Sequence, residues 1–136
     1  MELDLQLRLP NEEATLPVVR HVARSLLRDL GVSEEMAGDL ELAVGEACAN
    51  VVRHSDSDGS YLVEFGLRPP DCTIRVVDHG RGFEPSSLPR GQPDPVAEHG
   101  RGISIMRGLV DRIELESRPA GGTVVCLAKN LGPPEA

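Results

Sequence analysis

The succession of apolar patterns along the chain predicts an α+β fold, a two-layer sandwich of a mainly antiparallel mixed sheet with helices on one face. Alternating apolar and polar residues predict a strand at the start, and residues 12–30 and 33–54 then repeat apolar side chains at helical spacing. Two strands, a proline-rich segment, a short helix and two more strands follow. This order gives one sheet, with the helices collected on one of its faces.

The N-terminal half holds the first strand and both long helices. Leucines at every second position from Leu3 to Leu9 predict the strand, which ends at Pro10. Gly31 is a natural stop for the first helix. Ser33 is expected to cap the second helix, whose first turn is acidic and which ends at a turn cluster over residues 54–60.

Arg20, Arg24 and Arg28 recur at every fourth position of the first helix. This spacing places them on one side of that helix. The stripe is either a solvated face or a docking surface for an acidic protein partner, and the pattern alone leaves both interpretations open.

The C-terminal half is expected to be richer in strands. Residues 61–67 and 72–78 read as a hairpin, and residues 113–117 and 123–127 as a second pair. A short helical pattern begins after Gly102. We expect a single domain over residues 1–136, with a nucleotide lid at about 84–100 and a frayed tail at about 131–136.

Composition narrows the function classes. The chain has 136 residues, a formal net charge of -8 and a pI near 4.9, which argues against nonspecific binding to nucleic acid. With 40% hydrophobic but only 2% aromatic residues, the core is expected to consist of Leu, Val, Ile and Ala. The single lysine, Lys129, lies near the end, so neither a Walker A loop nor the lysine of a eukaryotic-type protein kinase is present.

Cysteine usage and hydropathy indicate the compartment. Cys48, Cys72 and Cys126 are odd in number and match no zinc or redox spacing, so they are interpreted as small apolar residues in a reducing environment. No run of 18 or more apolar residues and no leading apolar segment is present. A cytoplasmic protein without membrane contact is therefore expected.

Glu46 and Asn50 lie four residues apart in the second helix, at the edge of its apolar stripe. The carboxamide oxygen of Asn50 is a hard ligand of the kind that Mg²⁺ prefers. The carboxylate of Glu46 is a candidate acceptor for a proton from an attacking hydroxyl or water. A Glu-x-x-x-Asn pair by itself is more typical of an ordinary helix edge, and only the motifs downstream favour a functional pair.

Two glycine motifs follow downstream. Asp78 ends an apolar strand, where a partly buried carboxylate needs hydrogen-bond donors such as the exocyclic amine of adenine, and Gly80 and Gly82 allow a ligand to approach the backbone. Gly100 and Gly102 directly precede the short helix, whose free amide groups favour phosphate. The proline-rich segment before them is a candidate lid.

The order of these motifs, closed by Gly-Gly-Thr123 before the last strand, resembles the ATP-binding GHKL (Bergerat-fold) superfamily over nearly the whole chain. Within it, the chain length and the run from Glu46 to His54 are most similar to bacterial anti-sigma-factor serine/threonine kinases. The resemblance implies the Bergerat sandwich, with ATP and Mg²⁺ as cofactors.

Carried over to this chain, the resemblance implies a role for each matching position. Glu46 would be the general base and Asn50 the Mg²⁺ ligand. Asp78 would bind adenine with support from Thr123. The remaining positions would shape the adenine pocket (Gly80 and Gly82) and cradle the phosphates (Gly100 and Gly102), with Arg101 between them either touching a phosphate or facing solvent.

The resemblance also implies partners. The substrate would be an anti-anti-sigma protein of the STAS type, the second partner a sigma factor, and the chain itself a homodimer. Two alternatives stay open: a binding module that sequesters a partner without phosphorylating it, and an ATPase in which Glu46 activates water.

Overall fold

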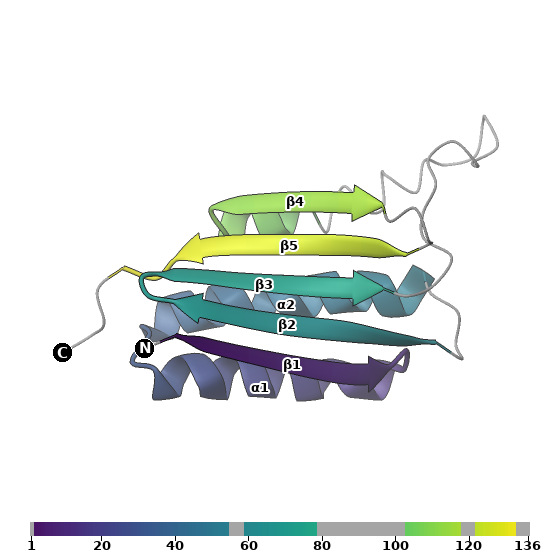
Figure 1. Cartoon of the computed structure of the whole chain (residues 1–136), viewed down its shortest axis with the longest axis horizontal. Coiled ribbons are helices and arrows are strands. Elements are labelled where there is room, and N and C mark those ends of the chain that lie inside the picture. The colour runs from purple at the N-terminus through teal and green to yellow at the C-terminus, as the bar shows by residue number, and fades with distance from the viewer. Residues whose placement is uncertain (1, 55–58, 79–102, 118–121, 133–136) are drawn as a thin grey trace.

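The computed structural model describes residues 2–54, 59–78, 103–117 and 122–132, and it has the α+β sandwich that the sequence predicts (Figure 1). Its elements in chain order are β1 (Leu3–Pro10), a 3-10 turn (Glu13–Thr15), α1 (Leu16–Asp29), α2 (Glu34–His54), β2 (Ser60–Arg68), β3 (Asp71–Asp78), a short helix over residues 103–109, β4 (Arg112–Ser117) and β5 (Thr123–Asn130). The expected lid lies outside the described residues.

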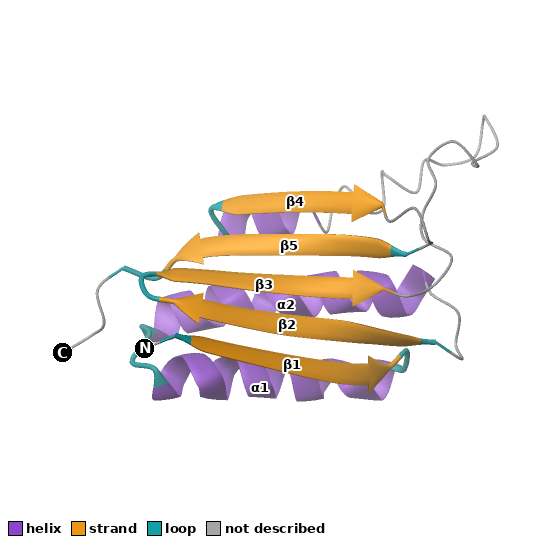
Figure 2. Cartoon of the chain, viewed as in Figure 1, coloured by secondary structure: helices purple, strands orange, loops and turns teal. Residues whose placement is uncertain are grey.

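The five described strands form one sheet in the order β1-β2-β3-β5-β4. All four of their ladders are antiparallel, where a mainly antiparallel mixed sheet was expected. Figure 2 shows the helices gathered behind the sheet, with α1 behind β1, α2 behind the middle strands and the short helix behind β4. One face of the sheet is therefore covered by helices, and none of the described elements covers the other, which is called the open face below.

Both long helices begin and end at local signals. α1 begins at Leu16, whereas the sequence predicts a start at residue 12. The difference arises because a 3-10 turn precedes the helix and Pro17 occupies its first turn, where no backbone donor is needed. Its end is set by Gly31, whose φ is +77°. The Ser33 hydroxyl accepts a hydrogen bond from the Met36 amide at 3.2 Å, which confirms Ser33 as the cap of α2.

The core lies between the helices and the sheet. Every second residue of β2 is buried, from Tyr61 to Leu67, and these side chains face α1 and α2. The core is mainly aliphatic, as predicted, but Tyr61 and Phe65 are its largest fully buried side chains. Cys48 and Cys72 are buried in it as free thiols, and burial raises the pKa of each to about 12.

The arginine stripe of α1 pairs with α2. Arg24 lies 2.7 Å from the carboxylate of Glu41 and 3.1 Å from that of Glu34, and Arg28 lies 2.9 Å from Glu34. These ion pairs raise the pKa values of both guanidinium groups, through hydrogen bonds first and charge second. Two of the three arginines therefore form ion pairs with α2. The sequence offered two interpretations, a solvated face or a docking surface for a partner, and neither includes this contact between the helices.

Candidate functional site

α2 has three flanks, and the two candidate catalytic residues share one of them. Its sheet-facing flank supplies the core, and its α1-facing flank carries Glu34 and Glu41. Asn50 comes nine residues after Glu41, which at about 100° per residue is roughly half a turn around the helix. Asn50, and Glu46 one turn before it, therefore lie on the flank away from α1.

Burial distinguishes the two side chains. Asn50 is 9% exposed, which makes it one of the few buried polar residues of the described chain, whereas Glu46 is only partly buried. A buried carboxamide is retained where its oxygen and amide have polar partners or a ligand. The helix thus presents a solvent-reachable carboxylate next to a more deeply placed amide.

Asp78 and Thr123 meet at adjoining strand ends. Asp78 is the last residue of β3, Thr123 is the first of β5, and the ladder between the two strands ends one step earlier at Val77 and Val124. Extending that register by one residue places Asp78 opposite Thr123. Both alternate with core residues, so both side chains lie on the helix-covered face, where Asp78 is 6% exposed.

The strand ends and the C-terminal half of α2 lie at the same end of the molecule. In Figure 1, α2 runs behind β3 with its C-terminal end toward the end of that strand, and α2 contacts both β3 and β5. The flank with Glu46 and Asn50 points away from α1, toward the side where β5 and β4 lie. The fold therefore brings all four of the described candidate residues to one end of the helix–sheet layer.

Tyr61 is a neighbour of this site that sequence reasoning missed. It pairs with Asp78 across β2 and β3 and is fully buried, and burial raises the pKa of its phenol. Its hydroxyl lies 2.6 Å from the hydroxyl of Thr15, which itself donates to the Glu12 carbonyl at 2.7 Å. Thr15 has one proton to give, so Tyr61 donates to Thr15. The signal in the sequence was that Tyr61 is the only tyrosine of the chain and stands at the start of a predicted strand.

The other predicted site residues cannot be placed. Gly80, Gly82, Gly100, Arg101 and Gly102 lie outside the described residues. The short helix that follows Gly102 is present over residues 103–109, with Met106 buried in the core. Within the described ranges, no three His, Cys, Asp or Glu side chains gather as a metal site.

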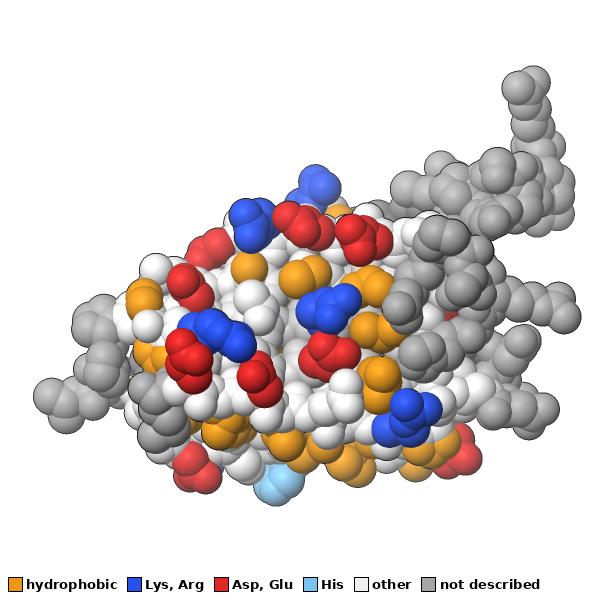
Figure 3. Space-filling view, viewed as in Figure 1, with side chains coloured by type: hydrophobic (Ala, Val, Ile, Leu, Met, Phe, Trp, Pro, Cys, Tyr) orange, Lys and Arg blue, Asp and Glu red, His pale blue; other side chains and the backbone are white. Residues whose placement is uncertain are grey.

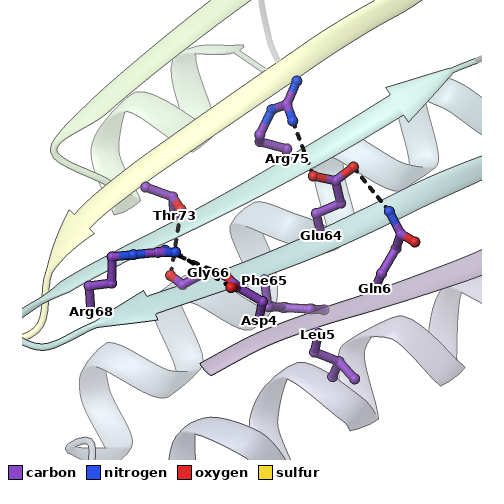
Figure 4. A pocket seen from close by; sticks show the side chains of 9 residues that line it. All are labelled: Asp4, Leu5, Gln6, Glu64, Phe65, Gly66, Arg68, Thr73 and Arg75. Carbon is purple, nitrogen blue, oxygen red and sulfur yellow. Dashed lines mark hydrogen bonds and ion pairs between the residues drawn. The ribbon is translucent and has the colours of Figure 1, made fainter. Parts of the chain in front are cut away.

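A shallow depression of about 440 Å³ lies away from these residues, on the open face of the sheet (Figure 4). Its charged lining is paired internally, since Arg75 lies 3.1 Å from Glu64 and Arg68 lies 3.4 Å from Asp4. A ligand there would have to replace existing ion pairs. The depression contains none of the predicted site residues, and it does not favour a binding site.

The chain is similar to curated bacterial protein kinases along most of its length. It is 27% identical to "Serine-protein kinase RsbW" of Bacillus velezensis over 93% of this chain and 85% of that protein. It is 24% identical to the protein of the same name from Bacillus subtilis, with the same coverage of both chains. In the described part of the chain, no helix combines the length and apolar character that crossing a membrane requires.

Solved structures share the fold. The RsbU and RsbW domains of Rv1364c from Mycobacterium tuberculosis superpose with a TM-score of 0.72 at 22% identity, over 95% of this chain and 32% of that one. The SiaB-SiaC complex from Pseudomonas aeruginosa gives 0.67 at 14% identity, over 91% of this chain and 88% of that one.

The histidine kinase domain of the Escherichia coli osmosensor EnvZ gives a TM-score of 0.52 at 20% identity and covers all of this chain and 91% of that one. A family described as "Histidine kinase-like ATPase domain" matches residues 9–129, which include every candidate site residue. With the sandwich and the gathered strand-end and α2 residues in place, this chain belongs to the histidine kinase-like ATPase domain family.

Proposed function

We propose that the chain is an ATP-dependent serine/threonine protein kinase that phosphorylates an anti-anti-sigma protein of the STAS type and holds a sigma factor. The family membership and the relatives named serine-protein kinase support an ATP-dependent activity. The observation that carries the proposal is the gathering of Glu46 and Asn50 on α2 with Asp78 and Thr123 at the strand ends.

Adenine would bind at the end of β3. A carboxylate on the buried face accepts hydrogen bonds, which suits the exocyclic amine of adenine and disfavours the carbonyl of guanine at the same place. Thr123, opposite Asp78 in the extended register, would support the base through its hydroxyl. Gly80 and Gly82 would let the base approach the backbone.

The phosphates would lie toward α2 and the short helix. Gly100, Arg101 and Gly102 precede that helix, and amide groups at its start would bind the phosphate oxygens. The segment at about 84–100 would close over the nucleotide as a lid. These assignments follow from the family resemblance.

The donors on α2 fit a magnesium ion. Asn50 offers a carboxamide oxygen at a buried position, and Mg²⁺ is usually held by one or two protein oxygens together with substrate phosphates and water. When bound, the ion would neutralise charge on the phosphates and orient them. Asn50 would be its direct ligand from this chain.

Glu46 would act on the incoming hydroxyl. Its carboxylate is partly exposed and lies one turn from Asn50, so it can be reached by a serine or threonine side chain from a partner. The hydroxyl oxygen would bond to the γ-phosphorus as the bond from phosphorus to the bridging β-γ oxygen breaks and ADP leaves, and Glu46 would take the hydroxyl proton.

The cellular setting follows from the same proposal. All three cysteines are free thiols. Free thiols and ATP use support the cytoplasm as the compartment. Hydrolysis of ATP, with Glu46 acting on water, is the second candidate, because the family is described as an ATPase domain.

The test is transfer of labelled phosphate from ATP to an anti-anti-sigma protein, compared between the wild-type chain and Glu46→Gln. Removal of a general base is expected to lower the transfer rate at least about 100-fold while ATP binding is retained. Glu35→Gln is the matched control, because Glu35 is an exposed carboxylate on the same helix. Label that is released as free phosphate without an acceptor would support hydrolysis instead. Normal transfer by the Glu46 variant would contradict the proposed role.

A further inference from the structure

The outer side of α2, opposite its sheet-facing flank, takes no part in the core of the described chain. At about 100° per residue, side chains spaced alternately three and four residues apart form one stripe along this side. These residues are Asp39, Leu42, Glu46, Ala49 and Arg53. Leu42 is 56% exposed, and none of these residues belongs to the buried core cluster. The stripe is therefore a surface of α2 that the core does not use.

The charged residues of this stripe have no ion-pair partner among the described residues. On the α1-facing flank of the same helix, Glu34 and Glu41 are paired with arginines of α1. Asp39, Glu46 and Arg53 belong to none of the ion pairs found in the described part of the chain. Asp39 and Arg53 also lie too far apart to pair with each other, because each is two turns, about 10 Å, from Glu46. The stripe therefore presents an unneutralised acid at one end and an unneutralised base at the other.

The open face of the sheet is arranged differently. Figure 3 shows acidic and basic side chains next to one another on that face. Arg75 pairs with Glu64 there at 3.1 Å, and Arg68 pairs with Asp4 at 3.4 Å. A charged partner would have to replace these pairs to bind the open face, whereas the outer side of α2 offers charges that no other described residue occupies. Charge complementarity therefore favours α2 over the open face as the surface for a protein partner.

The proposed reaction indicates which partner covers the stripe. Glu46 lies at its middle, and phosphate transfer requires the acceptor hydroxyl within hydrogen-bond reach of this carboxylate. A stable protein interface covers roughly 800 Å² on each partner, so a protein that delivers a serine or threonine to Glu46 also covers the adjoining turns of α2. Leu42 and Ala49, one turn before and after Glu46, lie within that area. The acceptor is therefore the partner that contacts these side chains.

We propose that the outer stripe of α2 is the recognition surface for the acceptor protein, an inference that rests on the proposed kinase function. A basic side chain of the acceptor pairs with Asp39, an acidic one pairs with Arg53, and an apolar one packs on Leu42. From the helix rise, the two charged contacts lie about 10 Å to either side of the acceptor hydroxyl, and the apolar contact lies about 6 Å from it on the basic side. The surface thus selects acceptors by charge polarity as well as by their hydroxyl group.

Leu42 supplies the apolar centre of this surface. Single exposed leucines are common on proteins and do not by themselves indicate a binding site. Leu42 differs because it lies between the unneutralised Asp39 and Glu46, at the centre of the area that the acceptor has to cover. Apolar contacts at the centre of an interface exclude water and contribute more to affinity than contacts at its rim. Ala49, on the other side of Glu46, has a short side chain and leaves room for the acceptor to approach the helix.

The test measures acceptor binding and phosphate transfer separately. Titration calorimetry measures binding of an anti-anti-sigma protein to the chain saturated with a non-hydrolysable ATP analogue, and labelled ATP measures kcat and KM for that acceptor. Leu42→Asp and Asp39→Lys are each expected to raise the dissociation constant and the KM for the acceptor about tenfold or more. The affinity for the ATP analogue should not change, because neither side chain belongs to the proposed nucleotide site. A change confined to KM indicates lost docking rather than lost chemistry.

Exchange of charges tests the proposed polarity more sharply. In a set of acceptor variants, single lysines or arginines near the phosphorylated residue are changed to glutamate. One of these variants should bind the wild-type chain weakly and the Asp39→Lys chain with restored affinity, because recovery requires that the two side chains interact. Arg53→Glu should be rescued in the same way by reversal of an acidic acceptor residue. If no reversal rescues either variant, the proposed charge pairs are wrong.

Matched variants control for general effects of the substitutions. Leu115→Asp changes a leucine of similar exposure, 53%, on β4. Asp71→Lys reverses an exposed acid at the start of β3. Both variants should bind the acceptor with wild-type affinity, and thermal unfolding checks that every variant is folded.

The outcomes distinguish the recognition surface from the kinase function. A wild-type chain that binds the acceptor but transfers no phosphate would refute the kinase function, and weaker binding by the Leu42 and Asp39 variants would still support the surface. Transfer at the normal KM by both variants would overturn the surface and leave the kinase function in place. A wild-type chain that binds no acceptor, or a Leu42 variant that loses only sigma-factor binding, would also overturn the surface.

Discussion

At the scale of single residues, the position of Asp78 is the most informative feature of the site. A carboxylate is seldom placed on the buried face of a strand, because its charge must be compensated by hydrogen bonds. Here the carboxylate lies on the core side, next to Tyr61, whose own hydroxyl donates to Thr15. The Tyr61 ring therefore packs beside Asp78, but its hydroxyl donates its hydrogen bond to Thr15 and not to the Asp78 carboxylate. Because a carboxylate accepts several hydrogen bonds at once, Asp78 can serve a ligand from this position.

Asp78→Asn is expected to weaken ATP binding by about 10- to 100-fold, since a hydrogen bond to a charged group contributes about 1.5–3 kcal/mol. The preference for ATP over GTP should fall as well, because an amide can donate to the guanine carbonyl. Titration calorimetry with both nucleotides measures the two effects. Asp71→Asn, at the exposed start of the same strand, is the control and should bind ATP normally. Unchanged ATP affinity in the Asp78 variant would exclude the adenine contact.

At the scale of elements, α2 has to serve the sheet, α1 and the site at once. Gly38 and Gly45 of this helix differ in how much room a side chain would have. A Cβ at Gly45 would lie 3.2 Å from Nε of Arg20, so the missing side chain makes room for the arginine stem. A Cβ at Gly38 would meet nothing within 4 Å. Gly45 is thus explained by packing against α1, and Gly38 is not.

Gly38→Ala is therefore expected to raise the free energy of unfolding by about 1 kcal/mol, the gain from replacing an unconstrained glycine within a helix. Gly45→Ala should gain less, because the Arg20 side chain must shift to admit the methyl group. Urea unfolding at neutral pH compares both variants with the wild type. An equal gain at the two positions would mean that Arg20 does not restrict Gly45.

The ion pairs between α1 and α2 should make stability depend on pH in the acid range. Hydrogen bonds from Arg28, and then from Arg24, lower the pKa of Glu34 from its ordinary value of 4.5. A carboxyl group with a lowered folded-state pKa stabilises the fold above its unfolded-state pKa, and this contribution disappears as the pH falls through the folded-state pKa. The wild type should thus exceed Glu34→Gln in stability near neutral pH and lose that advantage below about pH 4.

The effect should be small, because Glu34 is 61% exposed and solvent screens the pair. Denaturant unfolding at several pH values measures it, with Glu35→Gln as a control that removes a neighbouring exposed carboxylate. A pH-independent difference between wild type and Glu34→Gln would show that the ion pairs do not contribute through charge.

Most helices and strands could be predicted from local sequence signals. The features that could not be predicted depend on contacts between residues far apart in the sequence. The Ser33 cap, the Gly31 stop and the alternating leucines of β1 are written in neighbouring residues, so those elements were expected at nearly the right bounds. The pairing of the arginine stripe with Glu34 and Glu41 depends on how two helices meet. The proximity of Asp78 and Thr123 likewise depends on the register of β3 and β5. The order of the motifs suggested that the two residues act together, but their positions follow only from the folded sheet.

At the scale of the whole molecule, the proposed nucleotide would connect its two layers. Asp78 and Thr123 belong to the sheet, whereas Glu46 and Asn50 belong to α2. Such a ligand would contact the strands at one end and the helix at the other. It would therefore bind only when the sheet and α2 are packed together. Binding should therefore appear as an increase in the stability of the entire domain rather than of one element.

At 100 times its dissociation constant, ATP with Mg²⁺ is expected to add about 2.7 kcal/mol to the free energy of unfolding and to raise Tm by about 10 °C. Omitting Mg²⁺ should reduce this shift, and Asn50→Ala should make the shift insensitive to Mg²⁺ because the variant lacks the proposed ligand from α2. Thermal unfolding with ATP, with and without EDTA, measures both effects, and GTP serves as the control for base recognition. An Asn50 variant that still responds fully to Mg²⁺ would show that the ion is bound elsewhere. Loss of the entire ATP shift in that variant would instead mean that Asn50 organises the whole pocket and not the metal alone.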